Sequence, residues 1–214
     1  MEVAKNINQK LKEIPNRVKI VAATKYVEAE DMEKLLDLGI TNFGENRVDA
    51  FLEKYEALKD KPIHWHFIGH LQSNKAKQVV SKIEMLHSLD SLRLAEVIEK
   101  ECIEPLDCLI EVNINRENSK SGILLDDCEA FLKEVQKYSK VRIRGLMCMT
   151  MRESSSIEKQ NQFSRLRQLM EELNEHLGLS MKELSMGMSD DYQEAIASGS
   201  TIVRLGRMLW EPAK

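Results

Sequence analysis

The sequence lacks the features that mark an exported, membrane-spanning or disulfide-stabilised protein. No apolar run approaches the ~20 residues that a membrane-spanning helix needs, and the charged segment MEVAKNINQKLKEIPNR has no apolar core like that of a signal peptide. The four cysteines form no CxxC pair, which argues against a zinc site or a redox motif; they are Cys102, Cys108, Cys128 and Cys148. We therefore expect a cytoplasmic protein whose thiols are reduced.

The chain also lacks an excess of positive charge. Its formal net charge is −4 and its sequence pI is about 5.8, and the basic residues are scattered along the chain, so we expect neither nucleic acid nor a membrane as a partner. Hydrophobic residues make up 43% and charged residues 31%, which is ordinary for a soluble globular protein. No linker rich in Pro, Gly or Ser divides the chain, so we predict one domain over residues 1–214.

What the sequence does contain is a repeated alternation of short apolar runs and amphipathic helices. The near-continuous apolarity of the runs is typical of parallel strands that are covered on both faces. Eight runs are predicted strands: residues 19–24, 40–43, 63–68, 85–89, 107–113, 141–150, 184–186 and 201–205. A helix around residues 3–14 precedes the first run. This pattern predicts an α/β fold, a single (β/α)₈ TIM barrel with an N-terminal helix and no C-terminal β-domain; a doubly wound open sheet is the main alternative.

Functional groups of such barrels gather at the C-terminal ends of the strands. Lys25 directly follows the first predicted strand, KIVAAT. At the rim of an apolar barrel mouth its ammonium group would be partly desolvated, which favours the neutral amine that attacks a carbonyl. The alternative is a surface lysine that extends from the rim into water.

Two small-residue motifs follow the last two predicted strands, where barrels commonly bind phosphate. In SMGMS, Ser189 offers a hydroxyl and an amide, and after RLG the amides of Gly206 and Arg207 can form an opposite wall. The alternative is a pair of tight turns in which Ser189 caps the next helix. Their coincidence at neighbouring strands favours phosphate binding.

The segment HWHFIGH has histidines at a spacing that is similar to that of metal ligands. His64 and His66 share one face of a strand, but Gly69 interrupts the pattern before His70, and no carboxylate or cysteine lies nearby in the sequence. We therefore predict interior and rim histidines with satisfied hydrogen bonds and no metal site.

A family resemblance is carried by seven segments in order: VAATKY, FGENRVDAF, HWHFIGHLQSNKAK, NINRENSKSG, RGLMCMT, LSMGMSDDYQEAI and GSTIVRLG. Together they closely resemble the pyridoxal phosphate homeostasis proteins, from about residue 18 to residue 209. The resemblance implies the fold of the alanine racemase N-terminal domain and pyridoxal 5′-phosphate (PLP) as the cofactor.

The resemblance also implies roles for individual residues. Lys25 matches the lysine that forms a Schiff base with PLP, Asn46 matches a residue lining the ring and its hydroxyl side, and Arg204 matches the arginine facing the pyridine nitrogen. Ser189 and Gly206 match phosphate-binding positions. Further residues expected to line the same mouth are His70, Asn74 and Met188.

The chain departs from the family pattern after the RxG glycine. Family members usually have threonine or serine there, whereas this chain has Arg207. The Arg207 amide can still donate to a phosphate, while its guanidinium either adds a charge-assisted bond or points away. The C-terminal segment MLWEPAK also lacks the usual FG ending.

These assignments separate two functions. An arginine at the ring nitrogen donates a hydrogen bond but no proton, so PLP would be a weak electron sink, and the second base of the racemases lies in a β-domain that this chain is predicted to lack. We expect a PLP-binding carrier or buffer that holds PLP as a Schiff base on Lys25 in intracellular PLP homeostasis. A racemase-like enzyme acting on amino acids is the alternative, and a barrel for another phosphorylated metabolite would leave Lys25 idle. The expected partners are PLP and PLP-requiring apo-enzymes, and the expected state is a monomer or a weak dimer.

Overall fold

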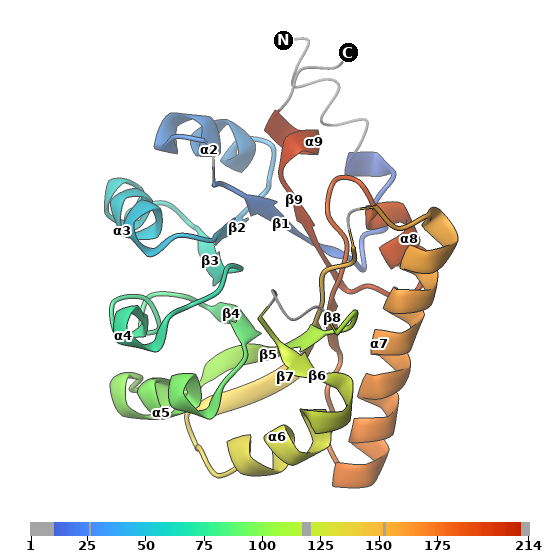
Figure 1. The fold of residues 1–214 in the computed structure, drawn as a ribbon. Coiled ribbons are helices and arrows are strands. Elements are labelled where there is room, and N and C mark those ends of the chain that lie inside the picture. The colour runs from blue at the N-terminus through green and yellow to red at the C-terminus, as the bar shows by residue number, and fades with distance from the viewer. Residues whose placement is uncertain (1–10, 26, 117–120, 152, 211–214) are drawn as a thin grey trace.

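Eight parallel strands form a closed barrel with helices around its outside (Figure 1). The computed structural model describes residues 11–25, 27–116, 121–151 and 153–210. Along the ladder the strands pair in the order β4-β3-β2-β1-β9-β8-β7-β5, and β4 also pairs with β5. This last pairing joins the two ends of the ladder, so the predicted barrel is confirmed and the open sheet, which would have two free edges, is wrong.

Each predicted strand overlaps one strand of the barrel. The strands are β1 (Lys19–Ala23), β2 (Asn42–Glu45), β3 (His64–Phe67), β4 (Met85–Leu89), β5 (Leu106–Asn113), β7 (Val141–Met147), β8 (Glu183–Ser185) and β9 (Ile202–Leu205). A further strand of two residues, β6 (Ile123–Leu124), pairs with the end of β5 outside the closed ring. The sequence does not predict β6.

Helices follow most of the strands and carry local stop and start signals. They are α2 (Ala29–Leu36), α3 (Val48–Ala57), α4 (Ser73–Ala76), α5 (Leu92–Glu101), η1 (Leu125–Asp127), α6 (Cys128–Val135), α7 (Ser156–Leu177), α8 (Tyr192–Ala197) and α9 (Arg207–Trp210). The hydroxyl of Ser91 accepts from the Leu94 amide and caps α5. Gly178 ends α7 with a left-handed φ of 62°. Of the predicted helix around residues 3–14, residues 11 and 12 are helical and residues 1–10 lie outside the described part.

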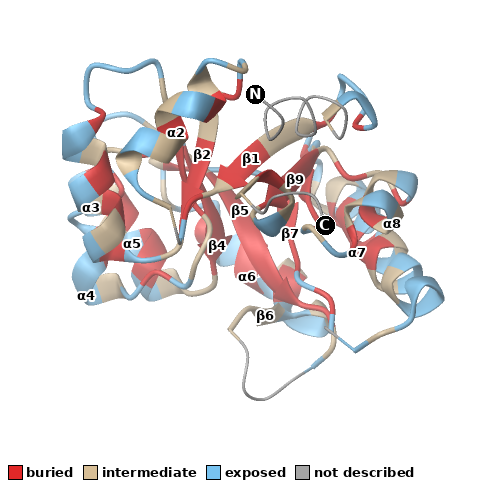
Figure 2. Cartoon of the chain, turned by 90° about the horizontal axis from the view of Figure 1, so that it is seen from above, coloured by how far each residue is buried: buried red, intermediate tan, exposed pale blue. Residues whose placement is uncertain are grey.

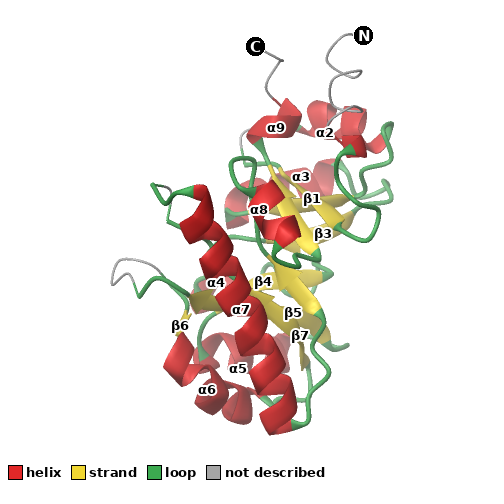
Figure 3. Cartoon of the chain, turned by 90° about the vertical axis from the view of Figure 1, so that its right-hand side faces the viewer, coloured by secondary structure: helices red, strands yellow, loops and turns green. Residues whose placement is uncertain are grey.

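Two hydrophobic clusters fill the molecule. The larger one lies between the barrel strands and the inward faces of the helices, and Figure 2 shows these buried residues in red beneath exposed outer helix faces. Figure 3 shows the longest helix, α7, running along the outside of the barrel. A smaller cluster of side chains from five different strands fills part of the barrel interior: Val21, Met85, Leu109, Met147 and Ile202. None of the described helices is long and apolar enough to cross a membrane.

Candidate functional site

The ends of β1 and β9 lie side by side, which brings the predicted lysine and the RLG motif to one part of the barrel mouth. In the register of the two strands Ala22 is paired with Leu205, so Gly206 directly follows the paired end of β9 and Lys25 lies two residues after the end of β1. The ring nitrogen of Trp210 in α9 donates to the carbonyl oxygen of Ala23 at 2.8 Å. The turn after β1 and the turn after β9 are therefore held together.

Ser189 joins the same group of residues from the loop after β8. Its Oγ accepts hydrogen bonds from the amides of Gly206, at 3.3 Å, and Met208, at 3.2 Å. The next helix, α8, begins only at Tyr192, and Ser189 does not cap it. Of the two alternatives for SMGMS and RLG, the structure therefore shows the two motifs converging around a set of backbone amides.

Gly206 is not required by the fold itself. It does not have a positive φ, and a Cβ at this position would meet its nearest neighbour, the Cβ of Ala23, at 3.6 Å, an ordinary van der Waals contact. The protein could thus accommodate an alanine here without strain. Without a Cβ, glycine leaves room for a ligand to approach the backbone closely at this turn, where the Gly206 amide donates to Ser189 Oγ.

The side chain of Arg207 forms an ion pair with the carboxylate of Asp190, next to Ser189. Both side chains are about half exposed, at 55% and 53%. The guanidinium of Arg207 is thus paired with a neighbouring carboxylate, an arrangement that the sequence did not suggest. Asp190 partly neutralises the positive charge that Arg207 could otherwise offer to a phosphate.

Lys25 follows β1 after one intervening residue, Thr24, and is exposed. This exposure is that of the alternative, a lysine that extends from the rim into water. The carbonyl oxygen of the preceding residue, Thr24, accepts a hydrogen bond of 2.6 Å from Nζ of Lys54. The backbone just before Lys25 is thus anchored by a buried hydrogen bond, while Lys25 itself is exposed to water.

Asn46 follows β2 and presents a buried acceptor. Its amide donates to Oε2 of Glu45 at 2.9 Å, while its Oδ1 is buried and has no hydrogen-bond partner among the described residues. A Cβ on Gly69 would come within 2.5 Å of the Asn46 carbonyl oxygen, so glycine is required there for the close approach of the two loops. An unsatisfied buried acceptor costs about 1–3 kcal/mol, so the site favours a ligand that donates a hydrogen bond to Asn46.

Arg204 extends from β9 into the barrel and is only 4% exposed. Its Nη1 donates to the carbonyl oxygen and the hydroxyl of Ser185, at 2.8 and 2.6 Å, and its Nη2 donates to the carbonyl oxygen of Cys148 at 3.0 Å. Burial lowers the pKa of Arg204. Three of the five guanidinium N–H groups are thus used to fix its plane.

A chain of hydrogen bonds continues from Arg204 across the barrel interior. The Ser185 hydroxyl lies 2.9 Å from Nδ1 of His87, His87 Nε2 lies 2.9 Å from Nδ1 of His66, and His66 Nε2 lies 3.0 Å from Oδ1 of Asn42. Burial lowers the pKa of His66 to about 3 and the pKa of His87 well below its ordinary value. Both rings are therefore neutral, and each donates through Nε2 and accepts at Nδ1.

This chain runs in one direction, with every donor pointing away from Arg204. It ends at the amide oxygen of Asn42, so the three polar side chains between Arg204 and Asn42 all have hydrogen-bond partners inside the barrel. Sequence reasoning missed it. A strand period of two places His66 on one face of β3 and His87 on one face of β4, but it does not show that these faces meet.

A buried carboxyl group that the sequence analysis also missed lies on β5. Burial, followed by the negative charge of Asp90, raises the pKa of Glu111 from 4.5 to about 7, while the positive charges of Arg204 and His70 oppose that rise. His70 Nδ1 in turn lies 2.9 Å from the Asp90 carboxylate. The mouth of the barrel therefore holds a carboxyl group that can bind or release a proton near neutral pH.

The remaining residues considered in the sequence do not gather at one place. His64 pairs with Glu84 at the surface, whereas His66 is interior and His70 pairs with Asp90, so the three histidines of HWHFIGH do not converge. Among the described residues, no group of three or more His, Cys, Asp or Glu side chains could hold a metal ion. Asn74 lines an open cavity of about 360 Å³, and Met188 is exposed.

Comparisons with known proteins show the family and the fold of the chain. The model of the family described as alanine racemase, N-terminal domain, matches residues 2–212. A pyridoxal phosphate homeostasis protein of Aquifex aeolicus is 38% identical over 202 residues, which cover 93% of this chain and 89% of that protein. The structure of PipY from Synechococcus elongatus, solved with PLP bound, is 31% identical, with a TM-score of 0.88 over 97% of this chain and 99% of PipY.

A more distant likeness concerns the fold alone. An alanine racemase of Clostridium difficile superposes with a TM-score of 0.79 at 14% identity, and the match covers 98% of this chain but 56% of the racemase. The fold and the mouth thus define a barrel of the alanine racemase N-terminal-domain class. Within that class, the chain belongs to the family of the pyridoxal phosphate homeostasis proteins.

Proposed function

We propose that this chain binds PLP, holds it as a Schiff base on Lys25, and acts in intracellular PLP homeostasis as a carrier or buffer. The observation that carries the proposal is the juxtaposition at β1 and β9, where an exposed lysine and a group of backbone amides follow neighbouring strand ends. The related PipY structure contains PLP, and the Aquifex aeolicus relative is named for PLP homeostasis.

The polar groups at the mouth match the three polar edges of PLP. The amides of Gly206 and Arg207 and the hydroxyl of Ser189 would hold the phosphate. The unpartnered Oδ1 of Asn46 would accept from the ring hydroxyl, and Arg204 would donate to the pyridine nitrogen. When bound, PLP supplies an aldehyde and an electron-withdrawing ring.

The covalent step is a condensation. Lys25 Nζ forms a C=N bond with the aldehyde carbon, and the aldehyde oxygen leaves as water with the two protons of the neutral amine. Because Lys25 is exposed, its amine can react with the aldehyde without first being moved out of a buried position. Solvent access also allows hydrolysis in the reverse direction, as a protein that releases PLP requires.

Arg204 favours a carrier over an enzyme. Its guanidinium is fixed by Ser185 and Cys148 and donates hydrogen bonds without transferring a proton, so it would leave the ring nitrogen unprotonated. A racemase-like activity on amino acids is the second candidate, and Glu111 is the observation that favours it. Its carboxyl group has a pKa of about 7, which suits a general base.

Incubation of the PLP-loaded protein with L-alanine in deuterated water distinguishes the two functions. A carrier should leave the α-hydrogen in place while PLP stays bound, and mass spectrometry with chiral analysis measures both label and configuration. Rapid α-deuteration with inversion, lost in Lys25→Ala and in Glu111→Gln, would instead establish the racemase-like enzyme. Deuteration without inversion would indicate Lys25 acting as a base on one face.

The biological setting follows from the same proposal. We propose that the chain works as a single-domain barrel in the cytoplasm, as a monomer or weak dimer, and delivers PLP to PLP-requiring apo-enzymes. The PLP-loaded protein should restore the activity of an apo-aminotransferase. The rate of this reactivation should be higher than the rate with the Lys25→Ala variant that was pre-incubated with the same amount of PLP. Sedimentation velocity at increasing concentration measures the oligomeric state.

A further inference from the structure

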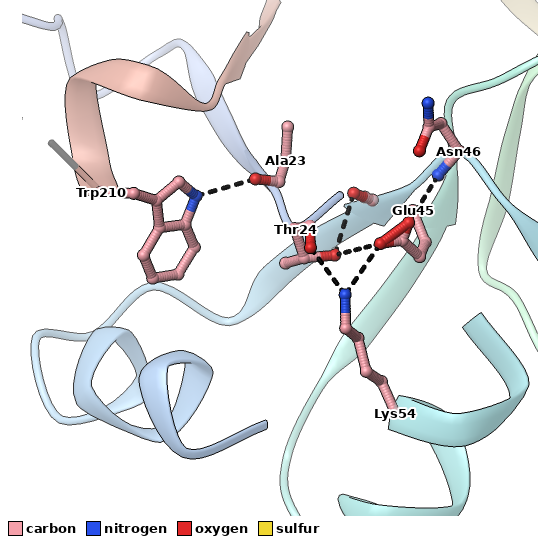
Figure 4. Close-up of polar contacts among 7 residues, drawn as sticks. Ala23, Thr24, Glu45, Asn46, Lys54 and Trp210 are labelled. Carbon is pink, nitrogen blue, oxygen red and sulfur yellow. Dashed lines mark hydrogen bonds and ion pairs between the residues drawn. The ribbon is translucent and has the colours of Figure 1, made fainter. Parts of the chain in front are cut away.

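A buried ion pair lies directly beneath the turn that carries Lys25. Nζ of Lys54 in α3 lies 2.9 Å from Oε1 of Glu45 at the end of β2, and their side chains are 9% and 0% exposed. Figure 4 shows the pair between the ends of β1 and β2. Glu45 and Lys54 therefore interact in a place where water screens them very little.

Stability alone does not explain such a pair. Removing two charges from water carries a desolvation cost that often cancels their attraction, so apolar replacements of both partners are frequently as stable. Other hydrogen bonds of Glu45 and Lys54 go to backbone groups, which indicates that the pair fixes the backbone.

Both charged groups bind the backbone of residues at the candidate site. Lys54 Nζ donates to the carbonyl oxygen of Thr24 at 2.6 Å, one residue before Lys25. Glu45 Oε2 accepts from the amide of Asn46 at 2.9 Å. The pair thus links the turn that carries Lys25 to the turn that carries Asn46.

A third contact holds the same turn from its other side. Nε1 of Trp210 donates to the carbonyl oxygen of Ala23 at 2.8 Å (Figure 4). Trp210 ends α9, which begins at Arg207, directly after Gly206. The two residues before Lys25 are therefore tied to β2 and α3 on one side and to the amide-rich turn on the other.

We infer that Glu45, Lys54 and Trp210 are positioning residues, which hold the Lys25 turn at a fixed place relative to Asn46 and the amides around Gly206. The inference rests on the proposed function, because its purpose is to bring Lys25 Nζ to the aldehyde of a bound PLP. Lys54 itself is committed to Glu45 and Thr24. Its task is to fix the backbone, while Lys25 forms the covalent bond.

The decisive variant removes both charges together, as Glu45→Leu with Lys54→Met, because it leaves no uncompensated charge in the interior. We expect a melting temperature close to that of the parent and Schiff-base formation slowed by roughly 10- to 100-fold, since small misplacements of reacting groups have effects of that size. Stopped-flow absorbance near the Schiff-base band measures the rate. Binding of pyridoxine 5′-phosphate, which has an alcohol in place of the aldehyde, should stay within about threefold of the parent, a smaller change than one lost hydrogen bond produces.

Several outcomes would overturn the inference. An unchanged rate in the double variant would show that the pair does not position Lys25, and equal losses for PLP and pyridoxine 5′-phosphate would show a general structural role. If the double variant does not fold, Trp210→Phe removes only the Nε1 donor, and an unchanged rate there also overturns the inference. Failure of the parent protein itself to bind PLP would instead overturn the proposed function.

The chain offers a matched control. Lys61 and Glu33 form an ion pair at 2.6 Å with both side chains 45% exposed, away from the barrel mouth. Glu33→Leu with Lys61→Met makes the same chemical change at a solvated site. The control should leave both the rate with PLP and the affinity for pyridoxine 5′-phosphate unchanged.

Discussion

Replacing Glu111 by glutamine should change the pH dependence of stability. Glu111 is 4% exposed, and burial together with Asp90 raises its pKa from 4.5 to about 7. Between these pH values the folded protein keeps a proton that the unfolded chain has lost. The free energy of unfolding therefore falls as pH rises, by ~1.4 kcal/mol per pH unit and ~3 kcal/mol in all.

Glutamine has no proton to lose, so Glu111→Gln should lack this decline. Urea unfolding at steps from pH 4.5 to 8.5 measures the difference between variant and parent. We expect the variant to gain on the parent by up to ~3 kcal/mol towards pH 8 and the gain to vanish near the acid end. Glu53→Gln, at an exposed position of α3, is the control and should give a constant difference. Parallel curves for parent and Glu111→Gln would refute the argument that burial raises this pKa.

Three further substitutions test the mouth. Gly206→Ala should fold normally, because the added Cβ would make an ordinary contact with Ala23 at 3.6 Å. The variant should bind PLP ~10-fold more weakly, as measured by fluorescence titration. An unchanged affinity would show that the phosphate binds elsewhere. Gly69→Ala puts a Cβ within 2.5 Å of the Asn46 carbonyl oxygen and should lower the free energy of unfolding by ~1–3 kcal/mol, whereas a parent-like urea midpoint would contradict the packing. Ser189→Ala removes one neutral hydroxyl donor to the phosphate and should weaken PLP retention in equilibrium dialysis by ~1 kcal/mol; complete loss would show that amides alone are insufficient.

The barrel could be predicted because its signals are local. Each buried strand appears as a short apolar run, and helix ends also depend on local residues: Ser91 caps α5 and Gly178 ends α7. Strand β6 was missed because two residues that pair only with the end of β5 leave no periodic pattern. The closure of the sheet depends on pairing between distant segments, and strand count together with chain length indicates it only indirectly.

The candidate site also contains residues that the sequence could identify and contacts that it could not. Lys25, Ser189 and Gly206 could be proposed because each lies just beyond the end of a predicted strand, and the C-terminal strand ends of a parallel barrel share one face. The contact between His66 and His87 depends on the register of neighbouring strands and on which faces turn inward, neither of which the sequence states. The sequence left open whether Lys25 is desolvated or extends into water, because burial at a rim depends on loops whose paths the sequence does not specify.

The structural assignments at the barrel mouth all depend on Lys25 being the residue that holds PLP. The most direct test incubates the purified protein with PLP, records the visible spectrum, reduces it with borohydride and maps the labelled peptide. The account predicts an absorption band that borohydride removes, with the label on Lys25 and with neither band nor label in a folded Lys25→Ala variant. A label on another lysine, or the same band in Lys25→Ala, would contradict it.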